Sequence, residues 1–94
     1  MSDLAFVWDE AKSRGNVRKH GVSFDEAQTV FYDENAREYP DPDHSATEDR
    51  FILLGLSRRL RVLVVCHCFR ESDSVIRIIS ARKAVKSEEK EYWS

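Results

Sequence analysis

The sequence has 94 residues, and we expect residues 1–94 to form one small domain with a modest core. Hydrophobic residues make up 41% of the chain and no apolar run is long enough to span a membrane, so the composition indicates a soluble, cytoplasmic protein and excludes a membrane-spanning one. The net charge of -2 is uneven, because residues 33–49 hold seven acids against one arginine, a net charge of -6 that leaves +4 elsewhere. An acidic ligand could therefore meet a basic surface, although scattered solvated Lys and Arg fit the same numbers.

The first predicted elements are a short strand over residues 4–8 and a polar helix that ends at Lys19 or His20. Asp9 is a residue type favoured at helix N-caps. Gly21 can adopt the left-handed conformation that commonly follows the last helical residue. The first helix is therefore expected between Asp9 and Gly21.

A second helix is expected directly afterwards. Ser23 and Glu26 form the Ser-x-x-Glu pattern of a capping box, and Val22 is placed to pack against Ala27. The apolar stripe of this helix would consist of Phe24, Ala27, Val30 and Phe31. The chain then becomes polar and contains two prolines, which indicates an exposed connection with one edge strand near residues 36–39.

The second half of the chain carries three strand-like runs, over residues 50–56, 61–69 and 75–81, and a final short helix within residues 83–93. Short turns separate the runs, so we expect an antiparallel meander. The predicted fold is thus α+β, with two N-terminal helices, an antiparallel sheet of about four strands and a short C-terminal helix.

One face of the first helix could bind phosphate. Lys12, Asn16 and Lys19 lie within about 60° of one another on the helical wheel, with His20 close by. Cations, an amide and an imidazole could hold a phosphodiester and move a proton near neutral pH. The alternative is a solvated face on which Lys and His complement the helix dipole.

Two arginines flank the apolar end of the last predicted strand. Alternation directs Arg77 and Arg82 to opposite faces, so at most one would face a groove, and we favour Arg77. A bulge near Ser80 could bring Arg82 round as well. The alternative is that one of them forms an ion pair with Glu48 or Asp49 across the sheet.

Arg50 and His67 are further candidates, because both lie on predicted strands. Alternation places His67 on the same face as Arg61 and Phe69, and this face could border a groove. The alternative for His67 is a structural histidine whose ring nitrogens have hydrogen-bond partners within the sheet. Cys66 and Cys68 flank it and are expected to be buried apolar thiols, and we expect neither a metal nor a cofactor.

Aromatic residues could stack on an unpaired base. The candidates are Trp8, Tyr39, Tyr92 and Trp93, although Trp8 at a strand end also fits core packing.

Several of these segments, taken in order, resemble the BrnT family of type II toxins, and the likeness covers nearly the whole chain. The amino-terminal part of the match is residues 6–9, Lys12, Asn16, residues 19–24, Glu26, Ala27, Val30 and Phe31. The later part is Glu48, Arg50, Gly55, residues 77–82, Ala84, Glu88 and Tyr92.

This resemblance implies a RelE-like fold, an RNA endonuclease activity that inhibits translation, and a BrnA-type antitoxin that carries the DNA-binding part of an autorepressing complex. Operator DNA would then be bound only through that complex. We expect metal-independent attack of a ribose 2′-hydroxyl on the adjacent phosphate, which leaves a 2′,3′-cyclic phosphate. The competing hypothesis is a non-catalytic module whose basic residues dock the antitoxin or nucleic acid.

The expected roles follow from side-chain chemistry. Protons would be moved by Lys19, His20 or His67, and charge on the phosphate would be stabilised by Arg50, Arg77 and Arg82. RNA would be held by Lys12, Asn16 and Tyr92.

Overall fold

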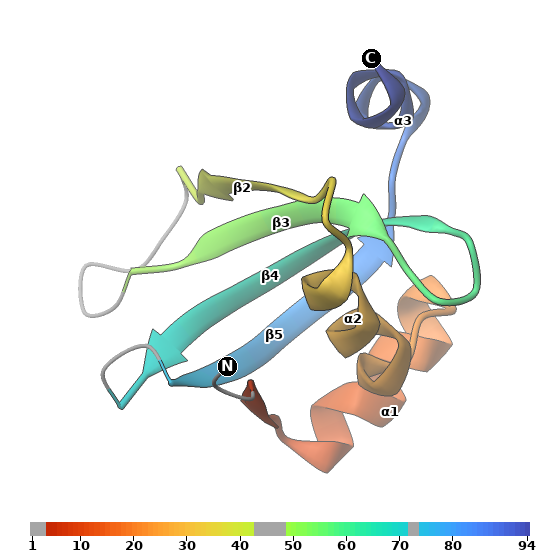
Figure 1. Cartoon of the computed structure of the whole chain (residues 1–94). Coiled ribbons are helices and arrows are strands. Elements are labelled where there is room, and N and C mark those ends of the chain that lie inside the picture. The colour runs from red at the N-terminus through yellow and green to blue at the C-terminus, as the bar shows by residue number, and fades with distance from the viewer. Residues whose placement is uncertain (1–3, 43–48, 72–73) are drawn as a thin grey trace.

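A computed structural model of the chain describes residues 4–42, 49–71 and 74–94. It is an α+β fold in which two helices lie against one face of a five-stranded sheet, and a third helix follows the last strand (Figure 1). In chain order the elements are β1 (Ala5–Val7), α1 (Glu10–His20), α2 (Phe24–Thr29), the 3-10 turn η1 (Val30–Tyr32), β2 (Arg37–Pro40), β3 (Phe51–Leu56), β4 (Val62–Arg70), β5 (Val75–Lys83) and α3 (Lys86–Trp93).

The sheet has the strand order β1-β5-β4-β3-β2. Strands β3 to β5 form the antiparallel meander that the short turns predicted, and β2 pairs antiparallel with β3 as the expected edge strand. The expected count of about four strands is corrected to five, and the sheet is not wholly antiparallel, because β1 pairs with β5 in parallel. Helices α1 and α2 connect β1 to the meander, and a connection of this length lets β1 join the last strand in the parallel sense.

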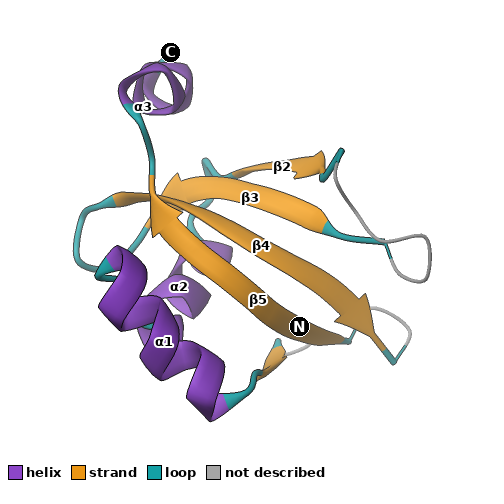
Figure 2. Cartoon of the chain, turned by 180° about the vertical axis from the view of Figure 1, so that it is seen from behind, coloured by secondary structure: helices purple, strands orange, loops and turns teal. Residues whose placement is uncertain are grey.

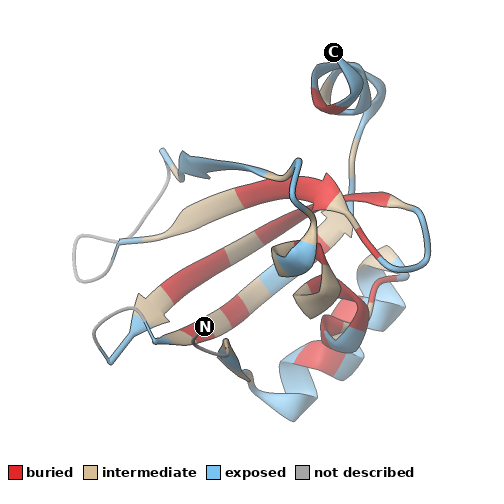
Figure 3. Cartoon of the chain, in the orientation of Figure 1, coloured by how far each residue is buried: buried red, intermediate tan, exposed pale blue. Residues whose placement is uncertain are grey.

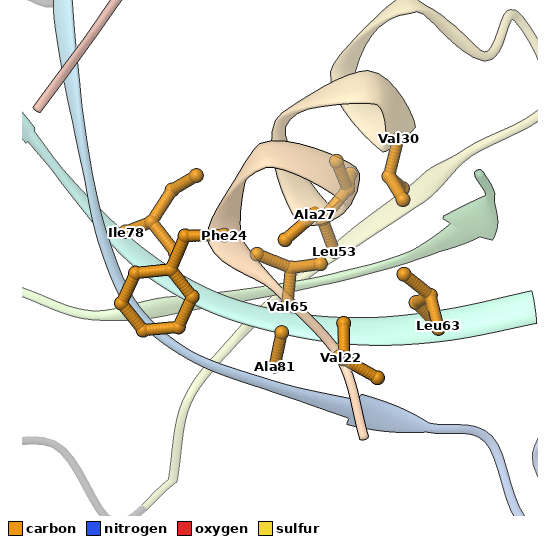
Figure 4. Close-up of a cluster of buried hydrophobic side chains, with 9 residues drawn as sticks. All are labelled: Val22, Phe24, Ala27, Val30, Leu53, Leu63, Val65, Ile78 and Ala81. Carbon is orange, nitrogen blue, oxygen red and sulfur yellow. The ribbon is translucent and has the colours of Figure 1, made fainter. Parts of the chain in front are cut away.

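The main core lies between the sheet and helices α1 and α2, on what we call the helix face (Figure 2). Buried positions concentrate in the middle of the strands and on the inner side of both helices (Figure 3). Figure 4 shows the cluster, which consists of Val22, Phe24, Ala27, Val30, Leu53, Leu63, Val65, Ile78 and Ala81. Burial of these side chains is the main force that holds the helices on the sheet.

The helix ends agree with the sequence signals. Asp9 accepts a hydrogen bond from the backbone N–H of Lys12 at 3.0 Å, and Gly21 has φ 71° and closes α1 on Val17. Ser23 accepts from the backbone N–H of Glu26 at 3.0 Å. These bonds fix where α1 and α2 begin and where α1 ends.

The side chain of Glu26 does not complete the predicted capping box. It is almost fully buried and accepts hydrogen bonds from Ser57 at 2.7 Å and from Nε of Arg61 at 2.9 Å. Arg61 also donates to the carbonyl of Gly21 at 3.0 Å. Burial alone would raise the pKa of Glu26, but the hydrogen bonds from Arg61 and Ser57 lower it below its usual value. This ion pair joins α2 to the turn between β3 and β4.

A smaller apolar cluster holds α3 on the opposite face of the sheet, which we call the open face. Tyr92 packs with Leu54, Val62 and Val64. Its hydroxyl donates to Asp33 at 2.6 Å. Burial, together with the carboxylate of Asp33, raises the pKa of Tyr92 to about 12, so this hydroxyl remains a donor. Tyr92 is therefore an anchor of α3.

The pairing of β4 with β5 contains a register shift, at which β5 has one residue more than β4. Cys66 lies opposite Ser80, but His67 lies opposite Ile78, so Ile79 is the extra residue of a β-bulge. A bulge reverses the alternation of side chains in the strand that carries it.

The bulge overturns the expected placement of two arginines. Arg77 lies opposite Cys68 and Arg82 lies opposite Val64, and both partners are on the same face of the unbroken strand β4. Directly paired residues point to the same side of a sheet. Arg77 and Arg82 therefore share the open face, and the prediction of opposite faces is wrong.

The predicted groove face is also corrected. His67 is completely buried on the helix face, and Arg61 on that face is paired with Glu26. Successive side chains of β4 point to opposite faces as predicted, but the face that carries His67 is the one covered by the helices.

Candidate functional site

A pocket of about 320 Å³ lies on the open face, between β3, β4, β5 and the end of α1. Three of the residues selected from the sequence meet in it, namely His20, Arg50 and Arg82. The full lining is His20, Asp41, Arg50, Ile52, Val64, Cys66, Ile79, Ser80, Ala81 and Arg82. We call this hollow the open-face pocket.

His20 reaches the pocket because α1 ends beside β5. The side chain of Asn16, one turn earlier, donates to the carbonyl of Ala81 at 2.8 Å and accepts from its N–H at 3.2 Å. It also donates to the carbonyl of Val22 at 2.7 Å. Asn16 thus fixes the end of α1, and its amide faces the protein rather than solvent.

Arg50 and Asp41 enter the pocket from the two strands at the far side of the sheet. The backbone N–H of Asp41 donates to the carbonyl of Arg50 at 2.9 Å, which continues the pairing of β2 with β3. Because of this backbone bond, the two oppositely charged residues line the same pocket.

Arg82 is held in place by α3. Its terminal nitrogens donate to both carboxylate oxygens of Glu88, at 2.8 and 2.9 Å. Glu88 also accepts from the backbone N–H of Val85 at 2.8 Å, at the start of α3. The ion pair lowers the pKa of Glu88. The Arg82 side chain keeps 42% of its surface exposed, so part of the guanidinium faces the pocket.

The partner of Arg82 differs from the sequence-based alternatives. Glu48 lies outside the described residues, and the pairing that the structure gives Arg82 is with Glu88, six residues along the chain. Glu88 was recognised only as part of the family pattern.

Sequence reasoning missed Asp41, Cys66 and Ser80 as pocket residues. Asp41 belongs to the acidic segment 33–49, and its position just beyond the predicted edge strand near residues 36–39 is the signal that could place it at the sheet. The Cys66 thiol lies 3.6 Å from a carboxylate oxygen of Asp41. Burial, and then the charge of Asp41, raises the pKa of Cys66 to about 11, so this cysteine is a thiol rather than a nucleophilic thiolate at neutral pH.

Arg77 lies outside the open-face pocket. It lines a separate hollow at the end of β1, together with Arg70 and Trp8. Lys12 and Lys19 are exposed on α1. These residues are accessible to a ligand, but the structure does not bring them into the pocket.

His67 is in the core. Its Nδ1 lies 3.2 Å from the carbonyl of Val65 and its Nε2 lies 3.0 Å from Glu38. The ring is surrounded by Phe31, Phe51 and Phe69. This environment matches the alternative of a histidine satisfied within the sheet.

Tyr92 is likewise unsuited to stack on a base, because its ring is buried between α3 and the sheet. Across residues 4–42, 49–71 and 74–94, no group of three or more His, Cys, Asp and Glu residues has a metal-binding arrangement. The helices in these ranges include none with the length and apolar character of a membrane span.

Comparison with known proteins gives a family and a similar fold. Residues 8–88 match the family model described as the ribonuclease toxin BrnT of type II toxin–antitoxin systems. The fold is similar to the crystal structure of the ribonuclease toxin BrnT from Brucella abortus, with a TM-score of 0.69 and 23% sequence identity, over 89% of this chain and 100% of that chain. No curated protein matches the sequence.

Proposed function

Because the chain belongs to the BrnT family of ribonuclease toxins of type II toxin–antitoxin systems, we propose that it is an endoribonuclease that inhibits translation by cleaving RNA in the open-face pocket. The observation that carries this proposal is the meeting of His20, Arg50 and Arg82 in one pocket, from three distant parts of the chain. An imidazole and two guanidinium groups suit a reaction that moves protons around a phosphate.

In the proposed reaction the 2′-hydroxyl oxygen attacks the adjacent phosphorus and the bond to the 5′-oxygen breaks. The Asp41 carboxylate accepts the proton of the 2′-hydroxyl, and protonated His20 donates a proton to the leaving 5′-oxygen. The products are a 2′,3′-cyclic phosphate and a 5′-hydroxyl. Arg50 and Arg82 stabilise the charge that develops on the phosphate oxygens.

We propose that this cleavage is independent of metal. Arg50 and Arg82 both line the pocket and supply the positive charge that a metal ion supplies in other nucleases. Lys12 and Lys19 on α1 would contact the RNA backbone beyond the pocket. Asn16, His67 and Tyr92 have no part in the proposed reaction, because each is buried and hydrogen-bonded within the fold.

A type II toxin has an antitoxin partner, and we propose that it is a BrnA-type protein that covers the open-face pocket. This antitoxin would carry the DNA-binding function, so the toxin would reach operator DNA only within the complex. The site of action would be the cytoplasm, where RNA is translated. The helices on one face of an antiparallel meander also support a RelE-like classification of the fold.

The test is cleavage of single-stranded RNA by the purified chain in excess EDTA, with the ends of the products mapped. We expect cyclic phosphate ends in EDTA. His20→Asn should lower kcat by about 10²- to 10⁴-fold, the usual contribution of a general acid. Lys90→Gln, on the exposed surface of α3, is the control and should cleave like the wild type.

Two results would contradict the proposal in different ways. Activity that EDTA abolishes and magnesium restores would refute metal independence. RNA that is bound but left intact by the wild type would instead favour the non-catalytic module.

A further inference from the structure

A second hollow lies where β1 meets α1. It has a volume of about 360 Å³ and is lined by Val7, Trp8, Asp9, Arg70 and Arg77. Arg77 pairs in register with Val7, and Arg70 lies on the neighbouring strand β4. This hollow therefore combines two arginines with an indole ring, outside the open-face pocket.

The two arginines are neighbours on one face of the sheet. Arg70 lies opposite Val75 and Cys68 lies opposite Arg77, so Arg70 and Arg77 are diagonal neighbours on adjacent strands. Within the described ranges neither guanidinium takes part in an ion pair, whereas those of Arg61 and Arg82 do. Like charges in this arrangement repel each other. An anionic ligand between them would remove that cost.

The one carboxylate in the lining is already engaged. Asp9 caps α1 by accepting from the backbone N–H of Lys12 at 3.0 Å. This bond directs one of its oxygens to the helix, and the lining residues together carry two cations against one anion. The carboxylate of Glu10 lies next to the lining and is bonded to the indole of Trp8. The lining itself thus has a net positive charge, which suits a phosphate.

Trp8 supplies a flat and well-fixed surface in the same hollow. Its indole Nε1 donates to Glu10 at 2.8 Å, and its ring packs edge-on against Phe24 with centroids 6.1 Å apart. Trp8 is half-buried and is one of the residues that line the hollow. Unpaired bases stack on aromatic rings that are held in this way.

We propose that Arg70, Arg77 and Trp8 form a second nucleotide-binding site, which holds the phosphate and base of one nucleotide of the RNA strand whose cleavage takes place in the open-face pocket. The proposal rests on the proposed function. Arg77 and Arg82 both lie on the open face of β5, five residues and roughly 15 Å apart. An extended RNA strand can span this distance, and it would pass the exposed residue Ser80.

The kinetic test compares a long single-stranded RNA, which reaches both sites, with an RNA dinucleotide, which fills only the pocket. The double variant Arg70→Gln/Arg77→Gln should raise KM for the long RNA about tenfold, lower the slope of log Kd against log salt by about 1.4, and leave kcat and dinucleotide cleavage unchanged. The control is Arg58→Gln/Arg59→Gln in the turn between β3 and β4, which removes the same charge and should change none of these values.

Fluorescence tests the stacking on Trp8. The chain has two tryptophans, so Trp93→Phe leaves Trp8 as the only one. RNA should quench this fluorescence, and the added Arg70→Gln/Arg77→Gln change should shift the quenching to about tenfold higher RNA concentration. A fluorescence that the long RNA leaves unchanged would overturn the role of Trp8.

A long RNA methylated at every 2′-oxygen separates this proposal from the proposed function, because it binds without being cleaved. If the wild type cleaves RNA but the double variant binds the methylated RNA with wild-type affinity and salt slope, the second site is refuted and the proposed function stands. If the wild type leaves RNA intact but the double variant binds the methylated RNA more weakly, the proposed function is refuted and the second site stands. If the double variant lowers kcat for the dinucleotide as much as it lowers cleavage of the long RNA, Arg77 acts in catalysis and the second site is also refuted.

Discussion

Replacement of Asn16 by alanine separates the two interpretations of the first helix. The sequence placed Asn16 on a phosphate-binding face, whereas the structure buries it between α1 and β5. Its side chain makes three hydrogen bonds to backbone groups, two with Ala81 and one with Val22. The substitution should therefore affect stability and not the intrinsic affinity for RNA.

The size of the effect follows from those bonds. Asn16→Ala leaves the N–H of Ala81 without its partner and removes one donor from each of two carbonyls. A buried donor left unsatisfied costs roughly 1–3 kcal/mol, and with the two weakened acceptors we expect a loss of about 3 kcal/mol. For a domain of this size that corresponds to a fall in Tm of roughly 12–24 °C.

The assay is thermal and urea unfolding of the wild type, Asn16→Ala and Asn16→Asp. The aspartate keeps an acceptor for the N–H of Ala81 but loses both donated bonds, so it should also be destabilised. Val17→Ala, at an exposed position of the same helix, is the control and should unfold close to the wild type. A variant Asn16→Ala that unfolds like the wild type but binds RNA more weakly would refute this reasoning.

Three further predictions concern ionisable side chains, namely Arg82, Glu26 and Cys66. Arg82→Gln should lower cleavage by about 10²- to 10³-fold while costing about 1 kcal/mol or less of stability, because its pair with Glu88 is partly exposed; wild-type cleavage at a matched concentration of folded protein would contradict its role. The folded-state pKa of Glu26 is lowered, so its pair with Arg61 stabilises the fold near neutral pH and loses this effect as the pH falls through that pKa. Glu26→Gln should therefore have a lower Tm than the wild type at neutral pH. Its Tm should also fall less steeply than that of the wild type between about pH 5 and pH 3. The pKa of Cys66 is raised to about 11, so iodoacetamide should modify this thiol much more slowly than it modifies glutathione at neutral pH. Mass spectrometry measures the rate. Rapid modification of Cys66 would show that the thiol is not shielded.

Local signals in the sequence predicted the elements that carry the site. Asp9, Gly21 and Ser23 set the ends of α1 and α2 through contacts within four residues, and such contacts can be predicted from residue types. The end of α1 at His20 followed from the same signals. The position of His20 in the last turn of α1 can therefore be predicted from the sequence, whereas its place beside the pocket needs the fold.

The placement of the arginines depends on a feature with no clear sequence signal. The bulge at Ile79 turns Arg82 to the same face as Arg77, and Ile79 is as apolar as its neighbours. A bulge near Ser80 is the alternative that the sequence leaves open, and the structure has it at the adjacent residue Ile79. One extra residue is enough to exchange the faces of every position beyond it.

Three polar residues that the sequence offers as site candidates are buried in the structure, and all three for the same reason. Asn16, His67 and Tyr92 find their partners 65, 29 and 59 residues away in sequence, in Ala81, Glu38 and Asp33. Residue type predicts that such a side chain needs a partner but does not identify it. A buried and satisfied polar residue therefore resembles a functional one until the fold is known.

The way the two sides of the sheet end has a consequence for the behaviour of the chain in concentrated solution. Beyond Arg77 none of the described strands lies on the outer side of β5, and there the amide of Asn16 occupies the N–H and carbonyl of Ala81 as a strand of another molecule would. On the other side, β2 presents charged residues and ends in Pro40. Exposed strand edges favour aggregation, and side-chain occupancy, charge and proline each oppose it. The antitoxin-free chain is thus protected from edge-to-edge association by side chains that belong to its own fold.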